Sequence, residues 1–161
     1  MRDLYNKIVN SEGYSKFIAS HSSSYLSHVS LIDEKGASSG WEFGFFYPAD
    51  SKITVIEANS LKVRKPDEAL SESGNVKKLE LEDVSVEGVD ALKLAEENAK
   101  LKGIDVVSKK IITLQNTEDL QWNITFLTAD FKIFNIKINA VSGEVNSSDL
   151  STVFDLGLRQ N

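Results

Sequence analysis

The two tryptophans of this chain open the same sequence pattern, 81 residues apart. Residues 41–45 (WEFGF) and 122–126 (WNITF) both alternate large apolar side chains with small or polar ones. Alternation with a period of two is typical of a β-strand that buries one face. Because the chain has 161 residues, a pattern repeated at this spacing divides it into two halves of nearly equal length. The sequence therefore predicts two similar units in tandem.

Two further strand patterns accompany each tryptophan. Residues 53–59 (ITVIEAN) and 133–139 (IFNIKIN) match at an offset of 80, so the first half has one extra residue in the preceding turn. Aliphatic runs at 30–33 and 110–114 lie upstream, and a polar stretch typical of a hairpin loop follows each. Each half is therefore predicted to form three successive strands of an antiparallel meander.

A helix is predicted before each meander. In the second half, alanines and a leucine recur at helical spacing within residues 86–102, with Ser85 as the N-cap and Gly103 as the stop. In the first half, with Asn10 or Ser11 as the cap, the residues at helical spacing are Tyr14, Phe17, Ile18, His21 and Tyr25. The predicted fold class is α+β, with two helix-plus-antiparallel-sheet units in tandem.

The segment between the halves is charge-rich and contains Pro66 and Gly74, which predicts a linker or a loosely packed excursion over residues 61–75. The predicted units are then residues 1–75 and 76–161. Alternation in residues 78–82 (KLELE) predicts a short edge strand, because charged side chains blunt edge pairing. At the other end, a strand is expected to resume at Val145, and residues 149–156 are predicted to form a last amphipathic helix.

The second half, residues 89–145, resembles a PepSY-like domain. That family shows a helix with paired alanines, a strand that begins Trp-x-h-x-h (h being hydrophobic) and a last strand that closes on Asp-Ala-x-x-Gly-x-h. Residues 139–145 (NAVSGEV) match this ending, with Asn139 in place of the aspartate. The first half matches only through Trp41 and residues 53–59, and it lacks the glycine-containing closing turn. The resemblance implies a helix laid on an antiparallel sheet, broadly as in cystatins.

The same resemblance implies a function. PepSY-like domains occur in protease propeptides and in bacterial and archaeal cell-envelope proteins, where they bind or restrain partners, including peptidases. We therefore expect a non-catalytic binding or inhibitory module, not an enzyme, that acts on a peptidase or cell-envelope partner. The resemblance implies an extracytoplasmic or cell-surface location, although the first ten residues contain no apolar stretch of a secretory signal. The binding residues of the family are not sharply defined, so none is transferred.

Composition narrows the function classes. A net charge of −6 argues against nucleic-acid binding, which needs concentrated positive charge. No apolar run approaches the length of a membrane span, so membrane insertion by this chain is not expected. The absence of cysteine excludes disulfides and thiolate chemistry. No phosphate-binding glycine motif or nucleophile elbow occurs, so no cofactor is expected.

The residues that could carry other chemistry are few. His21 and His28 are seven apart, too far for the i, i+4 spacing of a metal site on one helix. The acidic clusters lack the glycine turn of a calcium loop, and they lie at residues 80–83, 96–97 and 118–119. The tight basic patch consists of Lys62, Arg64 and Lys65. We therefore predict no catalytic, cofactor or metal residues and leave the binding residues open.

Three functional hypotheses follow from these observations. The first is the binding module, which would take an extended peptide at an exposed sheet edge or in a groove between the units. The second is a small-molecule-binding α+β domain, with a pocket between a helix and a curved sheet. The third is an enzyme that relies on carboxylates in a cleft with converging polar groups.

Overall fold

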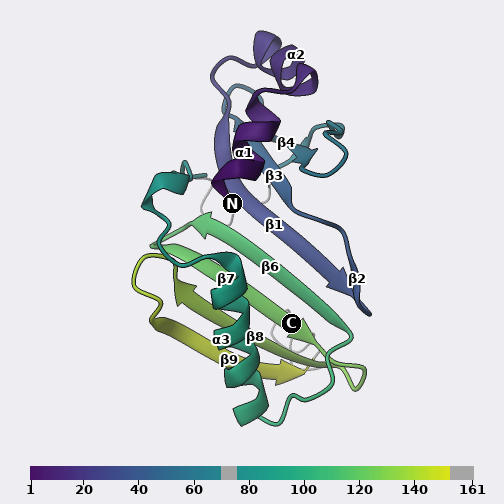
Figure 1. The fold of residues 1–161 in the computed structure, drawn as a ribbon, viewed down its shortest axis with the longest axis vertical. Coiled ribbons are helices and arrows are strands. Elements are labelled where there is room, and N and C mark those ends of the chain that lie inside the picture. The colour runs from purple at the N-terminus through teal and green to yellow at the C-terminus, as the bar shows by residue number, and fades with distance from the viewer. Residues whose placement is uncertain (70–75, 153–161) are drawn as a thin grey trace, which may run out of the picture.

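The computed structural model of the chain describes residues 1–69 and 76–152 (Figure 1). The described helices are α1 (Arg2–Val9), α2 (Glu12–Ser20), α3 (Gly88–Leu101) and a short 3-10 helix, η1 (Leu81–Asp83). The strands are β1 (Tyr25–Glu34), β2 (Ala37–Ser38), β3 (Glu42–Tyr47), β4 (Lys52–Glu57), β5 (Asp67–Glu68), β6 (Lys109–Asn116), β7 (Leu120–Leu127), β8 (Lys132–Asn139) and β9 (Val145–Thr152). The α+β class predicted from the sequence is confirmed.

All nine strands belong to one antiparallel sheet. Its order is β5-β4-β3-β1-β6-β7-β8-β9, and β2 pairs with the end of β1. The three strands predicted in each half form the two meanders, and these join where β1 pairs with β6. In that pair Leu31 lies opposite Ile112, which is 81 positions away, the same separation as that of the tryptophans. The sheet is therefore continuous across both halves.

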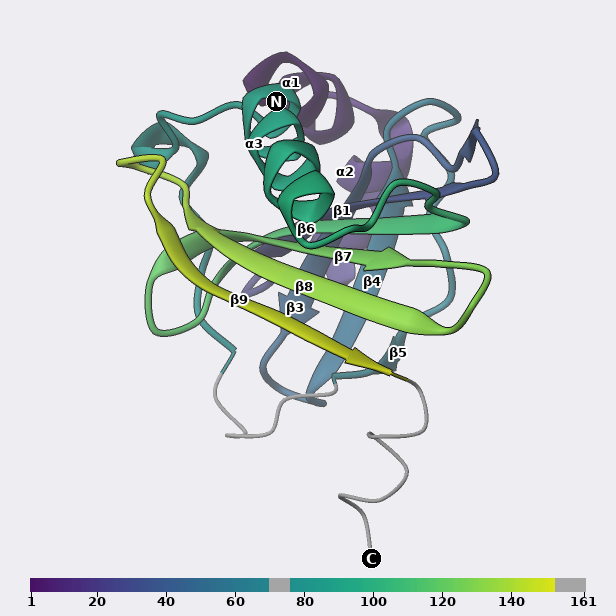
Figure 2. The same ribbon diagram turned by 90° about the horizontal axis from the view of Figure 1, so that it is seen from below.

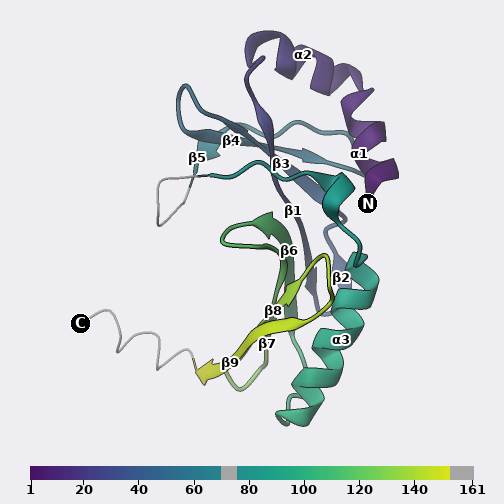
Figure 3. The same ribbon diagram turned by 90° about the vertical axis from the view of Figure 1, so that its left-hand side faces the viewer.

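The three α-helices lie on one face of this sheet, as Figures 2 and 3 show from two directions. Strand residues that face the helices form the core, and those with no exposed surface include Val29, Phe43, Ile56, Leu114, Trp122, Ile124, Phe126, Ile136 and Ile138. The opposite face carries polar side chains in register across neighbouring strands, namely Ser30, Thr113, Asn123 and Lys137. None of the described helices is long and apolar enough to cross a membrane.

The two tryptophans meet at the junction of the halves. Their ring centroids are 6.0 Å apart, beside the first turn of α3. Trp122 is fully buried, and its indole N–H donates to the Val86 carbonyl at 2.8 Å. A Cβ atom on Gly88 would lie 3.0 Å from Trp122 and 3.1 Å from Trp41, which is tighter than most Cβ contacts, so a larger residue there would press on both indole rings. The repeated tryptophan is thus a contact between the halves.

The helix predicted over residues 86–102 is confirmed as α3, but its predicted cap is wrong. Its inner face is Ala91, Ala95 and Ala99, which are buried against the sheet. Residue 87 holds the N-cap position, and the residues before it are bound to the end of β8, where the N–H groups of Ser85 and Val86 both donate to the Ala140 carbonyl. The helix stops just before Gly103, whose φ of +73° is the left-handed conformation expected of a glycine stop.

The first half differs more from its prediction. Ser11 does cap α2, since its hydroxyl accepts the N–H of Tyr14 at 3.1 Å. However, α2 ends at Ser20, and Tyr25 opens β1 instead of extending the helical stripe. Helix α1 was not predicted. It buries Ile8, and the guanidinium of its Arg2 donates to carbonyls of residues 81, 82 and 84.

Two further predictions need correction. Residues 78–82 do not form the predicted edge strand, because η1 begins at Leu81. Leu79 and Leu81 are both buried, and the Leu79 N–H donates to the Leu26 carbonyl at 2.8 Å. Residues 149–152 continue β9 and are not helical, because β8 offers them an open edge; residues 153–161 lie outside the described part of the chain.

Part of the predicted linker is bound to the sheet. Val63 bridges Ile56, and β5 pairs with β4. Residues 70–75 lie outside the described range, so the boundary between residues 75 and 76 stays a prediction.

Candidate functional site

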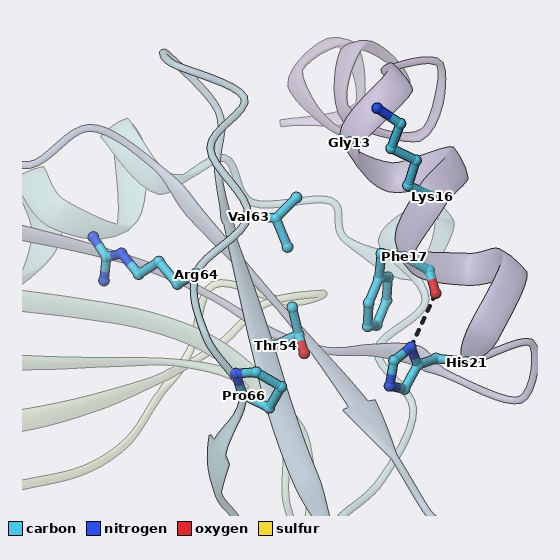
Figure 4. A pocket seen from close by; sticks show the side chains of 8 residues that line it. All are labelled: Gly13, Lys16, Phe17, His21, Thr54, Val63, Arg64 and Pro66. Carbon is cyan, nitrogen blue, oxygen red and sulfur yellow. Dashed lines mark hydrogen bonds between the residues drawn. The ribbon is translucent and has the colours of Figure 1, made fainter.

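A groove of about 370 Å³ lies between α2 and the edge of the sheet at β4 (Figure 4). It is open to solvent, and most of the surface that it presents is apolar. Its lining residues come from α2, from β4 and from the segment that follows β4: Gly13, Lys16, Phe17, His21, Thr54, Val63, Arg64 and Pro66.

The walls of the groove are fixed by aromatic packing and by a close approach. Phe17 and Tyr14 of α2 pack on Phe45 of β3, with ring centroids 6.1 and 5.2 Å apart. At the other end, a Cβ on Gly13 would lie 3.1 Å from a methyl group of Val63. The helix therefore touches the segment after β4 near Gly13 and diverges from it toward His21.

Thr54 brings an unpaired polar group to the groove. The residue is 4% exposed, and its hydroxyl makes no hydrogen bond with any described residue. Figure 4 shows this hydroxyl turned toward the side of the groove that carries Phe17 and His21. Since the hydroxyl is reached by solvent through the groove, it can donate to a ligand atom that replaces this water.

His21 supplies the second polar group. Its Nδ1 lies 3.0 Å from the Phe17 carbonyl and 2.9 Å from the Ser20 hydroxyl, and its ring stacks on that of Phe17. Since a carbonyl can only accept, this contact favours the tautomer with the hydrogen on Nδ1. The Nε2 lone pair is then available as an acceptor.

Both cations of the groove are paired with carboxylates. The Lys16 ammonium lies 2.6 Å from Glu12, one helical turn away. The Arg64 guanidinium extends away from the groove (Figure 4) and contacts Glu57 at 2.9 Å and also Glu42. Hydrogen bonds from Ser60 and Arg64 hold the pKa of the Glu57 carboxyl below its usual range. The groove thus offers hydrogen-bonding groups but little free charge.

The two histidines are not brought together. His28 lies on the sheet face opposite the helices, with its ring over Gly44, where a Cβ would fall 2.1 Å from Cε1. Burial lowers the pKa of His28. Among the described residues, no group of three His, Asp or Glu side chains is placed to hold a metal ion.

The charged clusters noted in the sequence lie on the surface. Glu96 pairs with Lys110 at 2.7 Å, whereas Glu97, Glu118 and Asp119 are exposed. Of the basic patch, Arg64 is engaged as described above, and Lys62 and Lys65 are exposed. Of these charged residues, Arg64 is the one that lines the groove.

A second candidate feature is the edge strand β9, at the opposite end of the sheet. Among the described strands, β8 is its one neighbour in the sheet, and six of its eight residues are exposed. The N–H of Asn139 donates to the Glu144 carbonyl at 2.8 Å, so the odd-numbered residues of β8 face β9. Residue 135 pairs with residue 149, so the odd-numbered residues of this part of β9 direct their N–H and carbonyl groups to β8. The even-numbered residues Ser148 and Leu150 therefore direct theirs to the open side.

The space between α3 and the sheet is packed as a core. The three alanines of α3 are 0–2% exposed, and the strand residues opposite them are equally buried. The groove lies instead between α2 and the sheet, so the small-molecule hypothesis, which places a pocket between a helix and a curved sheet, stays a hypothesis. The groove brings together Phe17 and Thr54, which are 37 positions apart, and no local sequence pattern signals that contact.

Comparison with known proteins identifies a fold. The chain is similar to the crystal structure of a protein described as a "putative lipoprotein" from Clostridium difficile 630, with a TM-score of 0.50. The sequences are 15% identical, and the match covers 87% of this chain and 91% of that chain. No family model matches the sequence, and no curated protein matches it. At this identity the likeness shows a shared fold and nothing of the activity.

Proposed function

We propose that this chain is a non-catalytic binding module of the cell envelope that restrains a partner, such as a peptidase, by pairing with it at β9. The observation that carries this proposal is the open edge of β9. An unpaired strand is a template for an extended segment, which gains main-chain hydrogen bonds by joining the sheet. Serine and asparagine on this strand leave the edge with little charge to oppose pairing.

The organisation of the sheet supports a second part of the proposal, that the chain contains two PepSY-like units in tandem. Each half places helical segments before a three-stranded meander, and the two meanders join through β1 and β6. The family's role in restraining partners then comes to this chain as a hypothesis. The likeness to a protein described as a lipoprotein supports the envelope as the compartment.

Replacing Ser148 by proline tests whether a partner pairs with the open edge of β9. Ser148→Pro removes an N–H that faces outward, so the pairing with β8 is retained while strand addition is blocked. The matched control is Ser148→Ala, which removes the hydroxyl and keeps the N–H. Binding is measured by biolayer interferometry against the purified peptidases and envelope proteins encoded beside this gene, and inhibition by peptidase assays.

We expect wild type and Ser148→Ala to bind a partner alike and Ser148→Pro to lose at least tenfold in affinity, since several main-chain hydrogen bonds depend on this edge. Equal binding by all three would refute the β9 edge as the site. No binding by the wild-type protein to any of these partners would refute the function itself.

A further inference from the structure

We propose that the groove beside α2 is a second binding site, which takes one apolar side chain of a peptide together with the adjoining uncharged peptide group. The site is independent of β9, because β4 and β9 lie toward opposite ends of the sheet. It therefore goes beyond strand addition and does not require it.

The apolar part of the site determines which side chain the ligand carries. Phe17, Val63 and Pro66 offer hydrophobic surface on both sides of the groove. A volume of about 370 Å³ is at the lower end of ligand sites, which run from about 300 to 1,000 Å³. It suits one aromatic or aliphatic side chain, whose burial stabilises the complex in proportion to the apolar area removed from water.

The polar groups of the site determine the peptide group of the ligand. Every peptide unit outside proline offers one N–H donor and one carbonyl acceptor. The Thr54 hydroxyl has no partner and can donate to a carbonyl, and the Nε2 atom of His21 can accept from an N–H. Figure 4 shows both groups along the same stretch of the groove, between β4 and the end of α2. One donor and one acceptor beside an apolar surface match a residue within a peptide chain.

The charges of the site argue for a neutral ligand over an anionic one. The Lys16 ammonium is held by Glu12 at 2.6 Å, and the guanidinium of Arg64 lies with Glu42 and Glu57. A fatty-acid carboxylate would have to compete with the carboxylates that already lie beside both cations. A peptide group has no net charge, so it needs hydrogen-bond partners but no charged partner in the site.

The test uses the full chain and three capped pentapeptides, acetyl-Gly-Ser-X-Ser-Gly-amide with X as Phe, Leu or Ala. Binding is followed by NMR at the Thr54 methyl group, the His21 ring and the Phe17 ring. We expect the Phe and Leu peptides to shift these signals and to bind at least tenfold more tightly than the Ala peptide. Decanoate serves as the contrast, and we expect it to bind more weakly than the Phe peptide.

The Thr54→Val variant removes the hydroxyl, and its effects on peptide affinity and on stability can be measured separately. In the free protein the hydroxyl has no partner, so the isosteric valine is expected to keep or raise Tm. Loss of one neutral hydrogen bond to the peptide should weaken binding about fivefold. Thr113→Val makes the same change on the opposite face of the sheet and should alter neither the affinity nor the shifted signals.

His21→Asn tests the second group, because the asparagine amide can replace Nδ1 as the donor to Phe17 but supplies nothing in the place of Nε2. We expect a weakening similar to that of Thr54→Val. Unchanged affinity in both variants overturns the proposal, and so does a wild-type protein whose groove signals shift only with decanoate or with no probe. Ser148→Pro should bind these peptides normally, so a failure here is distinguishable from a failure at β9.

Discussion

Replacing Trp122 by phenylalanine tests how the two halves are joined. Trp122 is 0% exposed, and its indole N–H donates to Val86 at 2.8 Å. Phenylalanine removes this donor and leaves part of the ring volume empty. Loss of the hydrogen bond costs about 1–2 kcal/mol and the smaller ring about 1–2 kcal/mol, so the free energy of unfolding should fall by about 2–4 kcal/mol. For a chain of this length, Tm should fall by about 5–15 °C.

Trp41→Phe is the matched control. Trp41 is only partly buried, and its indole makes no hydrogen bond with a described residue. The same substitution should therefore cost about 1 kcal/mol, mainly through lost apolar contact. The two variants also leave one tryptophan each, in different halves of the chain.

Urea unfolding followed by tryptophan fluorescence and by circular dichroism measures both effects. In Trp122→Phe the emission reports on the first half through Trp41, and in Trp41→Phe it reports on the second half through Trp122. Because the sheet is continuous through β1 and β6, we expect the fluorescence and circular dichroism transitions to coincide in each variant. Equal costs for the two substitutions, or two separate transitions, would refute this reasoning.

Three other substitutions probe the same structure. Gly88→Ala should destabilise the protein by about 1–2 kcal/mol in chemical unfolding, since its Cβ would crowd both indole rings; a more stable variant would contradict the packing. Burial lowers the pKa of His28, so below about pH 6.5 the unfolded state binds more protons and stability declines as pH falls. Melting curves of His28→Gln between pH 7.5 and 5.5 should show a smaller decline than wild type, and an equal decline would exclude this origin. Arg64→Gln should raise the pKa of Glu57 toward its ordinary value in a carboxyl NMR titration, and an unmoved midpoint would show that Ser60 suffices.

The strands of both meanders could be predicted because each buries one face. Alternation around Trp41 and Trp122 gave the strands and the offset between halves, and the same offset recurs in the β1–β6 pair. The helical pattern of the first half wrongly placed Tyr25 in the helix. His21 and three serines separate Tyr25 from α2, and a strand residue can fall at helical spacing by chance.

Other elements depend on partners that are distant in sequence. Residues 78–82 alternate like a strand and bury both Leu79 and Leu81, but the chain turns through η1 there and forms no strand. Helix α1 has Leu4, Tyr5 and Ile8 at helical spacing but is only eight residues long, and its Arg2 is fixed by carbonyls about 80 residues away. The groove depends on α2 packing against Phe45 of β3 and on the return of Val63 and Pro66, so only the folded chain defines it.

The pairing of β1 with β6 has a consequence for synthesis on the ribosome. Strand β1 ends at residue 34, whereas the strand that covers its second edge spans residues 109–116. At about 5–20 residues per second, the first meander waits several seconds with that edge uncovered. During this interval the β1 edge of one nascent chain can pair with β6 of a neighbouring chain on the same message. Such an exchange would yield an intertwined dimer with every strand pair of the monomer intact.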